Sequence, residues 1–365
     1  MNVNGNPYRS IWYDHEGDTV KIIDQTVLPH HFEIKTINSI TAMAEAIRVM
    51  RVRGAPLIGV AAAFGLYLAL RDDSDNKGLS KAEAIEYLKG TRPTAINLAW
   101  AMAAADKILD TLPPSGHAAA ALQFALDLAD EDVKTCEAIG EHGCDVLDRL
   151  WRSKSDQSAP LNVLTHCNAG WLATVDWGTA LSVLYKAQAR GIPLHVWVGE
   201  TRPRNQGAFL TTWELHQQGI PHTLIADNTG GHLMQQGLVD VCLVGSDRTT
   251  ASGDVCNKIG TYLKALAAFD NDIPFYVALP VSTIDFNIHD GLTEIPIEQR
   301  DSSEVLSISG LDEAGELRTI SLTHPEVIAG NYGFDVTPAR LVTGLITEKG
   351  LCTTDKESIA KLRLT

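Results

Sequence analysis

The first 151 residues show mainly the spacing of apolar residues that is typical of amphipathic helices. Two short apolar runs within residues 10–37 flank a polar turn and predict strands. Ser39 then precedes apolar residues spaced three and four positions apart, which indicates a helix with Ser39 as its N-cap. Further helices are expected at 57–70, 81–90, 94–111 and 117–150. Gly140 is a candidate break in the last of them.

The pattern changes after a polar, Ser-rich stretch at 152–160, which we interpret as a linker. Short apolar runs follow at 162–165, 194–198, 223–226, 239–244 and 275–279. The segments between them have helical spacing near 176–190, 206–218, 228–237 and 257–269. This alternation predicts βαβ units and a parallel sheet covered by helices on both faces. We therefore expect an α/β protein with two domains, residues 1–151 and 160–365.

Composition and charge narrow the range of partners. Hydrophobic residues make up 45% of the 365 residues and charged residues 21%, the balance of a globular protein with a large core. The formal net charge of -15 disfavours binding to nucleic acid and to anionic membranes. A phosphate ligand stays compatible with this charge, because a few Arg, Lys and backbone N–H groups can form a local positive site.

Several motifs typical of other functions are absent from the sequence. No strand is followed by G-x-G-x-x-G and no P-loop occurs, which argues against NAD or ATP as a cofactor. The six cysteines and twelve histidines lack metal-ligand spacing. The N-terminus does not resemble a signal peptide, and the longest apolar run, 57–70, is too short to span a bilayer. We expect a cytoplasmic protein with reduced thiols, no cofactor, no metal and no membrane partner.

Polar segments containing glycine directly follow four of the predicted strands. In open parallel sheets, ligands bind beyond the carboxyl ends of the strands. The four segments are therefore expected to meet at one edge of the sheet and to form a site there. They are residues 165–170, 199–203, 227–231 and 245–248.

Cys167 lies in the first of these segments and has two interpretations. A free cysteine is often a small buried hydrophobe. A thiol placed between a strand and a helix N-terminus can instead have a lowered pKa and react as the thiolate. The remaining cysteines that lie within helix or strand patterns are interpreted as structural: Cys136, Cys144, Cys242 and Cys352.

Asp247 lies in the last of these segments and also has two interpretations. An Asp after a strand is often only a turn or N-cap residue. However, Asn257 and Lys258 open the helix predicted at 257–269, and a helix N-terminus with a lysine can bind phosphate. A neighbouring phosphate would raise the pKa of Asp247 and favour its use as a general acid.

Arg53 and Arg92 each precede a predicted helix in the N-terminal region. Most exposed arginines are simply solvated. These two could instead reach across a domain cleft to a phosphate group.

With these segments assembled, the sequence resembles the methylthioribose-1-phosphate isomerase family. That family is related to the alpha, beta and delta regulatory subunits of translation initiation factor 2B. The resemblance covers nearly the whole chain and lies in motifs that occur in order. They are residues 53–56 (Arg-Gly-Ala-Pro), 92–98, 164–170, 200–203 (Glu-Thr-Arg-Pro), 206–208, 253–262, 274–278, 297–300 and 334–338.

The resemblance implies a helical N-terminal domain, which would carry the small β-sheet predicted above, and a Rossmann-like C-terminal domain without a dinucleotide. It also implies a homodimer and no metal. By motif, it implies that Cys167 and Asp247 are the catalytic pair. It further implies substrate-binding roles for Arg53, Gly54, Ala55, Arg92, Gln206, Asn257 and Lys258.

The expected reaction converts 5-methylthioribose 1-phosphate to 5-methylthioribulose 1-phosphate, as in methionine salvage. Asp247 would protonate the ring oxygen while Cys167, as thiolate, removes the C2 proton; a hydride shift is the alternative. Trp171 could supply an apolar wall that excludes water.

Two other functions stay open. The first is an isomerase for 5-deoxyribose 1-phosphate or ribose 1,5-bisphosphate, although no second cationic cluster for a 5-phosphate is evident. The second is a non-catalytic regulatory subunit like those of initiation factor 2B, which would have no need of an acid–base pair.

Overall fold

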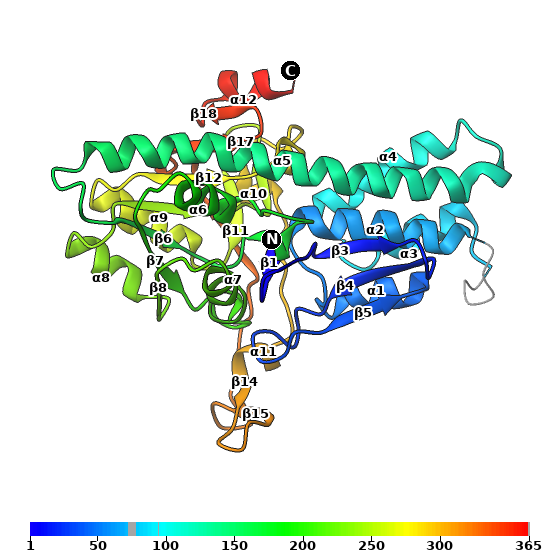
Figure 1. Ribbon diagram of the computed structural model, residues 1–365, viewed down its shortest axis with the longest axis horizontal. Helices are drawn as coiled ribbons and strands as arrows, with labels where there is room; N and C mark the ends of the chain where they lie inside the picture. The colour runs from blue at the N-terminus through cyan, green and yellow to red at the C-terminus, as the bar shows by residue number, and fades with distance from the viewer. Residues whose placement is uncertain (72–77, 94, 364–365) are drawn as a thin grey trace.

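The computed structural model describes residues 1–71, 78–93 and 95–363. Figure 1 shows two regions side by side, with the long helix α5 (His117–Ser153) running along both. The mostly helical region holds the N-terminus, and the larger α/β region follows α5 in the chain. The position of the predicted domain boundary stays a prediction.

The N-terminal region consists of helices packed beside a small antiparallel sheet of order β3-β4-β5. The strands of this sheet are β3 (Ile11–Asp14), β4 (Thr19–Ile23) and β5 (Ile34–Ile37), and β1 (Asn2–Val3) and β2 (Asn6–Pro7) pair with each other in a separate two-stranded sheet. The helices of this region before α5 are α1 (Ile40–Arg48), α2 (Ala55–Leu70), α3 (Lys81–Lys89), α4 (Ile96–Leu109) and the short η1 (Pro114–Gly116). The strands and helices predicted here are confirmed, although residue 94, the predicted start of α4, lies outside the described residues.

Two local predictions in this region have different outcomes. Ser39 is the N-cap of α1, since its hydroxyl oxygen accepts a hydrogen bond from the backbone N–H of Ala42 at 3.2 Å. The expected break at Gly140 is wrong, because α5 continues to Ser153. A Cβ atom on Gly140 would lie 3.1 Å from the backbone oxygen of Ser182, so this glycine permits close packing between α5 and α6.

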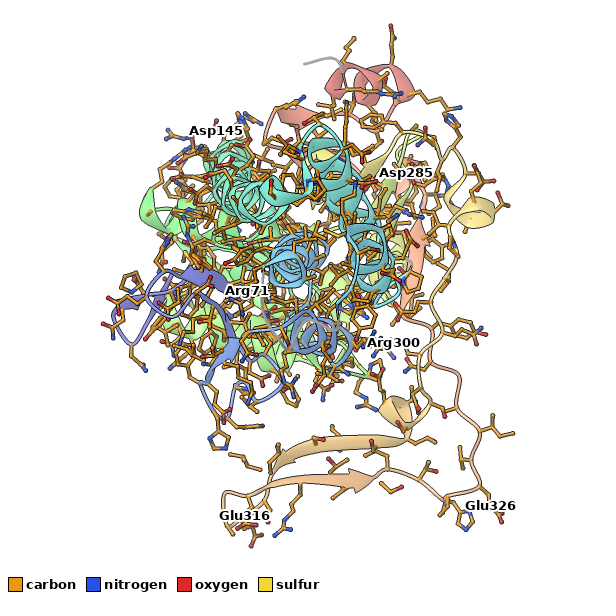
Figure 2. The ribbon with its side chains drawn as sticks, turned by 90° about the vertical axis from the view of Figure 1, so that its right-hand side faces the viewer. Arg71, Asp145, Asp285, Arg300, Glu316 and Glu326 are labelled. Carbon is orange, nitrogen blue, oxygen red and sulfur yellow. The ribbon has the colours of Figure 1, made fainter. Side chains whose placement is uncertain are left out.

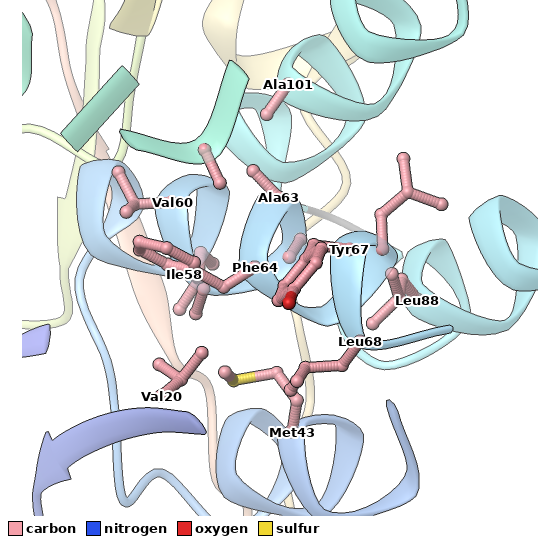
Figure 3. Packing of buried hydrophobic residues seen from close by; sticks show 14 of the residues in the cluster. Val20, Met43, Ile58, Val60, Ala63, Phe64, Tyr67, Leu68, Leu88 and Ala101 are labelled. Atoms are coloured by element: carbon pink, nitrogen blue, oxygen red, sulfur yellow. The ribbon is translucent and has the colours of Figure 1, made fainter. Parts of the chain in front are cut away.

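Helix α2 is the centre of the N-terminal core and positions one wall of the site described below. Its side chains are apolar on all faces, and 13 of its 16 residues are buried. Figure 3 shows Phe64 and Tyr67 of α2 in one buried cluster with Met43 of α1 and Leu88 of α3. Because α2 is packed on all sides, its N-terminus has a fixed position in the molecule.

The α/β region is built on a seven-stranded sheet of order β18-β17-β12-β9-β6-β7-β8. All neighbouring strands in it are parallel except β17 and β18. Its strands are β6 (Leu161–Thr165), β7 (Leu194–Gly199), β8 (His222–Ile225), β9 (Val241–Val244), β12 (Phe275–Ala278), β17 (Gly344–Thr347) and β18 (Gly350–Cys352). The associated helices are η2 (Trp171–Ala173), α6 (Ala180–Ala189), η3 (Gly207–Thr211), α7 (Thr212–Gln217), α8 (Thr229–Gln235), α9 (Thr261–Asp270) and α12 (Lys356–Leu362). The predicted parallel α/β sheet is thus confirmed.

A second sheet, of order β13-β10-β11-β16, lies beside the first. Its strands are β10 (Arg248–Thr250), β11 (Val255–Lys258), β13 (Ile284–Asp285) and β16 (Phe334–Thr337). The prediction that Asn257 and Lys258 open a helix is wrong, because both lie in β11 and α9 begins only at Thr261. Strand β11 pairs with β16, which places Lys258 opposite Phe334. The sequence around Lys258 contains no signal for a pairing partner that lies 76 residues further along the chain.

The hairpin of β14 (Ser307–Leu311) and β15 (Leu317–Ser321) projects from the body of the molecule (Figures 1 and 2). Short helical segments complete the fold: η4 (Val281–Thr283), α10 (Gly291–Glu294), α11 (Ser303–Leu306) and η5 (Ala339–Leu341). The hairpin was not predicted from the sequence.

Candidate active site

The carboxyl ends of β6 and β9 meet the N-terminus of α2 around one pocket, which we term the inner pocket. Among its lining residues are both members of the expected catalytic pair and four of the expected substrate-binding residues. They are Cys167, Asp247, Arg53, Gly54, Ala55 and Asn257. The structure therefore brings together side chains from the N-terminal region and from three separate segments of the α/β region.

Cys167 follows β6 in a left-handed backbone conformation, with φ of 63°. Its N–H donates to the Thr201 hydroxyl at 2.8 Å, and the hydroxyl of Thr211 donates to its carbonyl at 2.6 Å. Only the short η2 follows Cys167 in the chain, so the helix expected directly after this residue is absent. Burial raises the pKa of Cys167, while Arg53 and Lys258 oppose this increase. The expected lowering of the pKa of Cys167 by a helix N-terminus is therefore wrong.

Asp247 follows β9, and its backbone N–H donates to the carbonyl of Cys256 at 3.0 Å. Burial raises the pKa of Asp247, although the positive charges of Lys258, Arg53 and Arg92 act against this. The direction agrees with the sequence-based expectation, but its main cause is burial and not a neighbouring phosphate. A carboxyl group with a raised pKa is suited to donate a proton near neutral pH.

Arg53 and Lys258 place positive charge close to the thiol and the carboxyl. The Arg53 guanidinium donates to the side-chain and main-chain oxygens of Asn168 at 2.6 and 2.8 Å. Lys258 is 7% exposed, and its ammonium lies 5.0 Å from the ring centroid of Phe334. Burial lowers the pKa of Lys258, whereas Cys167 and Asp247 act to raise it.

The N-terminus of α2 forms the opposite wall of the inner pocket. Gly54 is its N-cap, with φ of 100°, a conformation that favours glycine. A Cβ atom at Gly54 would lie 2.3 Å from the carbonyl oxygen of Ala173. Because no side chain caps α2, the backbone N–H groups of Ala55 and Leu57 at its start are available to an anion, whereas Pro56 between them has none.

Arg92 and Gln206 line neighbouring pockets and not the inner one. Arg92 lines a side pocket together with Gly54, Ala55 and Asp247, and it pairs with Glu298 at 3.0 Å. Gln206 lines a cavity of about 260 Å³, which we term the outer cavity. Arg53 lines both this cavity and the inner pocket, so the two adjoin.

Sequence reasoning missed the residue that supports this arrangement, Glu214 of α7. Its fully buried carboxylate accepts hydrogen bonds from the backbone N–H groups of Trp171 and Leu172, at 2.9 and 3.2 Å. It also accepts from Tyr185 at 2.6 Å and from the amide of Asn168 at 2.8 Å. Glu214 thereby orients Asn168, which holds Arg53. Nothing in the helical pattern around residue 214 distinguishes it from a solvated glutamate.

Trp171 does not serve as the expected wall of the pocket. It is fully buried and packs against Trp213, with ring centroids 6.0 Å apart. It is a core residue, and the prediction for it is wrong. The four cysteines interpreted as structural all lie in helices or strands and are buried.

Residues 1–71, 78–93 and 95–363 lack a metal-binding cluster and a membrane-spanning helix. No group of three or more His, Cys, Asp or Glu side chains in this part of the chain could hold a metal ion. None of the helices described above is both long and apolar enough to cross a membrane.

Comparisons with known proteins agree on the family. Residues 51–354 match the model of the initiation factor 2 subunit family. The methylthioribose-1-phosphate isomerase of Rhodospirillum rubrum is 58% identical over 365 residues, covering 99% of this chain and 93% of the relative. The protein of that name from Escherichia coli is 55% identical, with coverage of 99% and 96%.

Two solved structures have the same fold. The 5-methylthioribose 1-phosphate isomerase of Pyrococcus horikoshii has a TM-score of 0.82 and 38% identity, covering 98% of this chain and 96% of that one. The translation initiation factor eIF-2B subunit delta of A. fulgidus has a TM-score of 0.78 and 37% identity, covering 98% and 100%. The chain belongs to the initiation factor 2 subunit family and, within it, to the methylthioribose-1-phosphate isomerases.

Proposed function

We propose that the protein isomerises 5-methylthioribose 1-phosphate to 5-methylthioribulose 1-phosphate, a reaction of methionine salvage. The observation that carries this proposal is the presence of Cys167 and Asp247 in one pocket, beside the free N-terminus of α2. Relatives with this name match the chain over nearly its full length. The reaction needs no external oxidant or reductant, because C1 is reduced as C2 is oxidised.

The substrate phosphate binds at the N-terminus of α2 in this proposal. The backbone N–H of Ala55 and the conformation of Gly54 form the anion site there. Arg92, which lines the side pocket, and Lys258 supply positive charge near Asp247, and Asn257 lines the inner pocket. Arg92 also pairs with Glu298 at 3.0 Å.

Asp247 acts as the general acid. The phosphate on the anomeric oxygen prevents opening through a free hemiacetal, so the ring oxygen needs a proton donor as its bond to C1 breaks. A carboxyl group whose pKa is raised by burial keeps that proton to a higher pH than an exposed aspartate does. The second step moves hydrogen from C2 to C1, and the proton of the C2 hydroxyl leaves as the ketone forms.

Cys167 faces the atoms that react in the second step. A thiolate could remove the C2 proton, and Arg53 and Lys258 would stabilise it electrostatically. Burial raises the pKa of the thiol, which favours a direct hydride shift from C2 to C1 with Cys167 contacting the substrate as a thiol. Running the reaction in D₂O separates the routes, because a proton abstracted by the thiolate exchanges with solvent and a shifted hydride does not.

The decisive test is incubation of the purified protein with 5-methylthioribose 1-phosphate, without added cofactor, followed by NMR. We expect the ketose to form, and expect Cys167→Ala and Asp247→Asn to reduce kcat by at least about 100-fold with little change in binding. No ketose from the wild-type protein would refute the function. Near-normal turnover in either variant would remove that residue from the mechanism.

We further propose that the protein is a cytoplasmic homodimer. On the surface of the α/β region, several apolar side chains are exposed: Leu224 of β8 is 49% exposed, and Leu263 and Phe269 of α9 are 61% and 62% exposed. Such a surface suits contact with a second copy. Light scattering after size exclusion tests this, and a monomer at micromolar concentration would contradict it.

A further inference from the structure

The outer cavity adjoins the inner pocket but is chemically different from it. Its apolar lining comes from Met50, Pro203, Phe209, Leu210 and Ile308. Its charged lining comes from Arg53, Arg204 and Glu304. With a volume of about 260 Å³, it has room for a substituent that extends from a sugar held in the inner pocket.

Glu304 is the acidic side chain of this lining. Its Oε1 lies 2.8 Å from Arg204 and 2.8 Å from Arg300, and its Oε2 accepts from Arg300 at 3.0 Å and from Asn331 at 2.9 Å. Burial alone would raise the pKa of Glu304, but these hydrogen bonds hold it at about 2. The carboxylate is therefore ionised at neutral pH and matched to two guanidinium groups.

These contacts form part of a chain of alternating charges along this end of the site. Arg92 pairs with Glu298, Glu298 with Arg300 at 2.9 Å, Arg300 with Glu304, and Glu304 with Arg204. Arg300 lies at the base of the projecting hairpin, as Figure 2 shows. Because Glu304 pairs with Arg204, this arginine does not present an unmatched positive charge to the outer cavity.

The direction of the substrate follows from the proposed function, on which this inference rests. If the 1-phosphate binds at the N-terminus of α2, the opposite end of the sugar, C5, extends past Arg53 toward the outer cavity. An uncharged methylthio group can pack there against Met50, Phe209 and Ile308. A 5-phosphate would instead meet the carboxylate of Glu304.

We propose that Glu304 determines substrate specificity by excluding a second phosphate from the outer cavity. It does so in two ways: its own charge repels a 5-phosphate, and it pairs with the guanidinium group of Arg204, which lines the same cavity and would otherwise bind one. A charged side chain in a binding site disfavours, in this way, a ligand that carries the same charge at that position.

The test compares 5-methylthioribose 1-phosphate with ribose 1,5-bisphosphate on the wild-type protein and on Glu304→Gln. The bisphosphate is measured by its kcat/KM or, without turnover, by its Ki as a competitive inhibitor. We expect Glu304→Gln to shift the preference toward the bisphosphate by about tenfold or more. Glu316→Gln is the matched control, because Glu316 pairs with exposed Arg318 on the hairpin outside the cavity and its loss should leave the preference unchanged.

A second variant covers the case in which Glu304→Gln fails to fold. Ile308→Lys places a positive charge in the outer cavity without removing an ion pair, and we expect it to shift the preference in the same direction. If the folded variants keep the wild-type ratio of the two sugars in kcat/KM or Ki, the role of Glu304 is overturned. An equal loss of kcat/KM with both sugars counts as such an unchanged ratio. Failure of the proposed function is a separate result, since the wild-type protein would then not turn over the methylthio sugar at all.

Discussion

Replacement of Asp132 by asparagine should make the protein more stable at alkaline pH and change little at acidic pH. Asp132 lies on α5, and its carboxylate accepts a hydrogen bond from the backbone N–H of Val175 at 2.7 Å. The preceding residues Ala173 and Thr174 line the inner pocket, so this contact holds one of its walls. Burial raises the pKa of Asp132 from 3.8 to about 7, against the lowering effect of the Val175 hydrogen bond.

The size of the effect follows from proton linkage. Below pH 3.8 the carboxyl is protonated in both the folded and the unfolded states, and its titration has no effect on stability. Between pH 3.8 and about 7 only the folded state holds the proton, so the free energy of unfolding falls as pH rises. About three pH units at ~1.4 kcal/mol each give a loss of ~4 kcal/mol, complete above pH 7. Asp132→Asn keeps an oxygen acceptor for Val175 and avoids this loss.

Urea unfolding at pH 4.5 and pH 8, followed by tryptophan fluorescence, measures the difference between the two proteins. At about pH 4.5 we expect Asp132→Asn and the wild-type protein to unfold at nearly the same urea concentration. At pH 8 we expect Asp132→Asn to unfold at a higher urea concentration, which corresponds to a free energy of unfolding several kcal/mol above that of the wild-type protein. Asp127→Asn is the control, because Asp127 is exposed on the same helix and bonds only to Gln123 among the contacts described. Equal midpoints for Asp132→Asn and wild type at both pH values would refute a buried, protonated Asp132.

The remaining predictions concern the site. Gly54→Ala should destabilise the protein by a few kcal/mol and raise KM, because its Cβ would overlap the carbonyl oxygen of Ala173; an unchanged Tm and KM would contradict this. Glu214→Gln should lower the free energy of unfolding by ~1–3 kcal/mol and reduce kcat/KM, because an amide N–H donor would then face the backbone N–H groups of Trp171 and Leu172. Full activity in this variant would show that the position of Arg53 does not depend on Glu214. For the general acid Asp247, kcat/KM should be highest below its raised pKa and fall about tenfold per pH unit above it. If kcat/KM instead rises with pH on both sides of this pKa, Asp247 is not the general acid.

Local signals in the sequence were sufficient for the framework of the fold. Ser39 before a helical pattern and the apolar runs of the parallel strands depend on neighbours within a few positions, and each was found where expected. The rule that ligands bind beyond the carboxyl ends of parallel strands then brought Cys167 and Asp247 to one pocket. The topology therefore limits where the chemistry can be, without any knowledge of side-chain contacts.

What the sequence could not show depends on distant pairing and on burial. Lys258 lies in a strand because β11 pairs with β16. From the sequence alone, a short apolar segment before a helix is equally compatible with a strand and with the first turn of that helix. The pKa of Cys167 is raised because several segments enclose it, and no local pattern reports that enclosure. Glu214 supports the site from a helix that looks like any other amphipathic helix.

The fold by itself does not separate an isomerase from a regulatory subunit, because solved structures with both names superpose on this chain. The distinction has to rest on what the side chains can do in the pocket. A buried thiol and a buried carboxyl are costly to keep close together, since burial disfavours the charged form of each group. Arg53 and Lys258 offset that cost for negative charge that develops at either group, and the same two cations attract a phosphorylated ligand. A binding protein needs only the cations; the thiol and the carboxyl beside them have a use when bonds to hydrogen are made and broken.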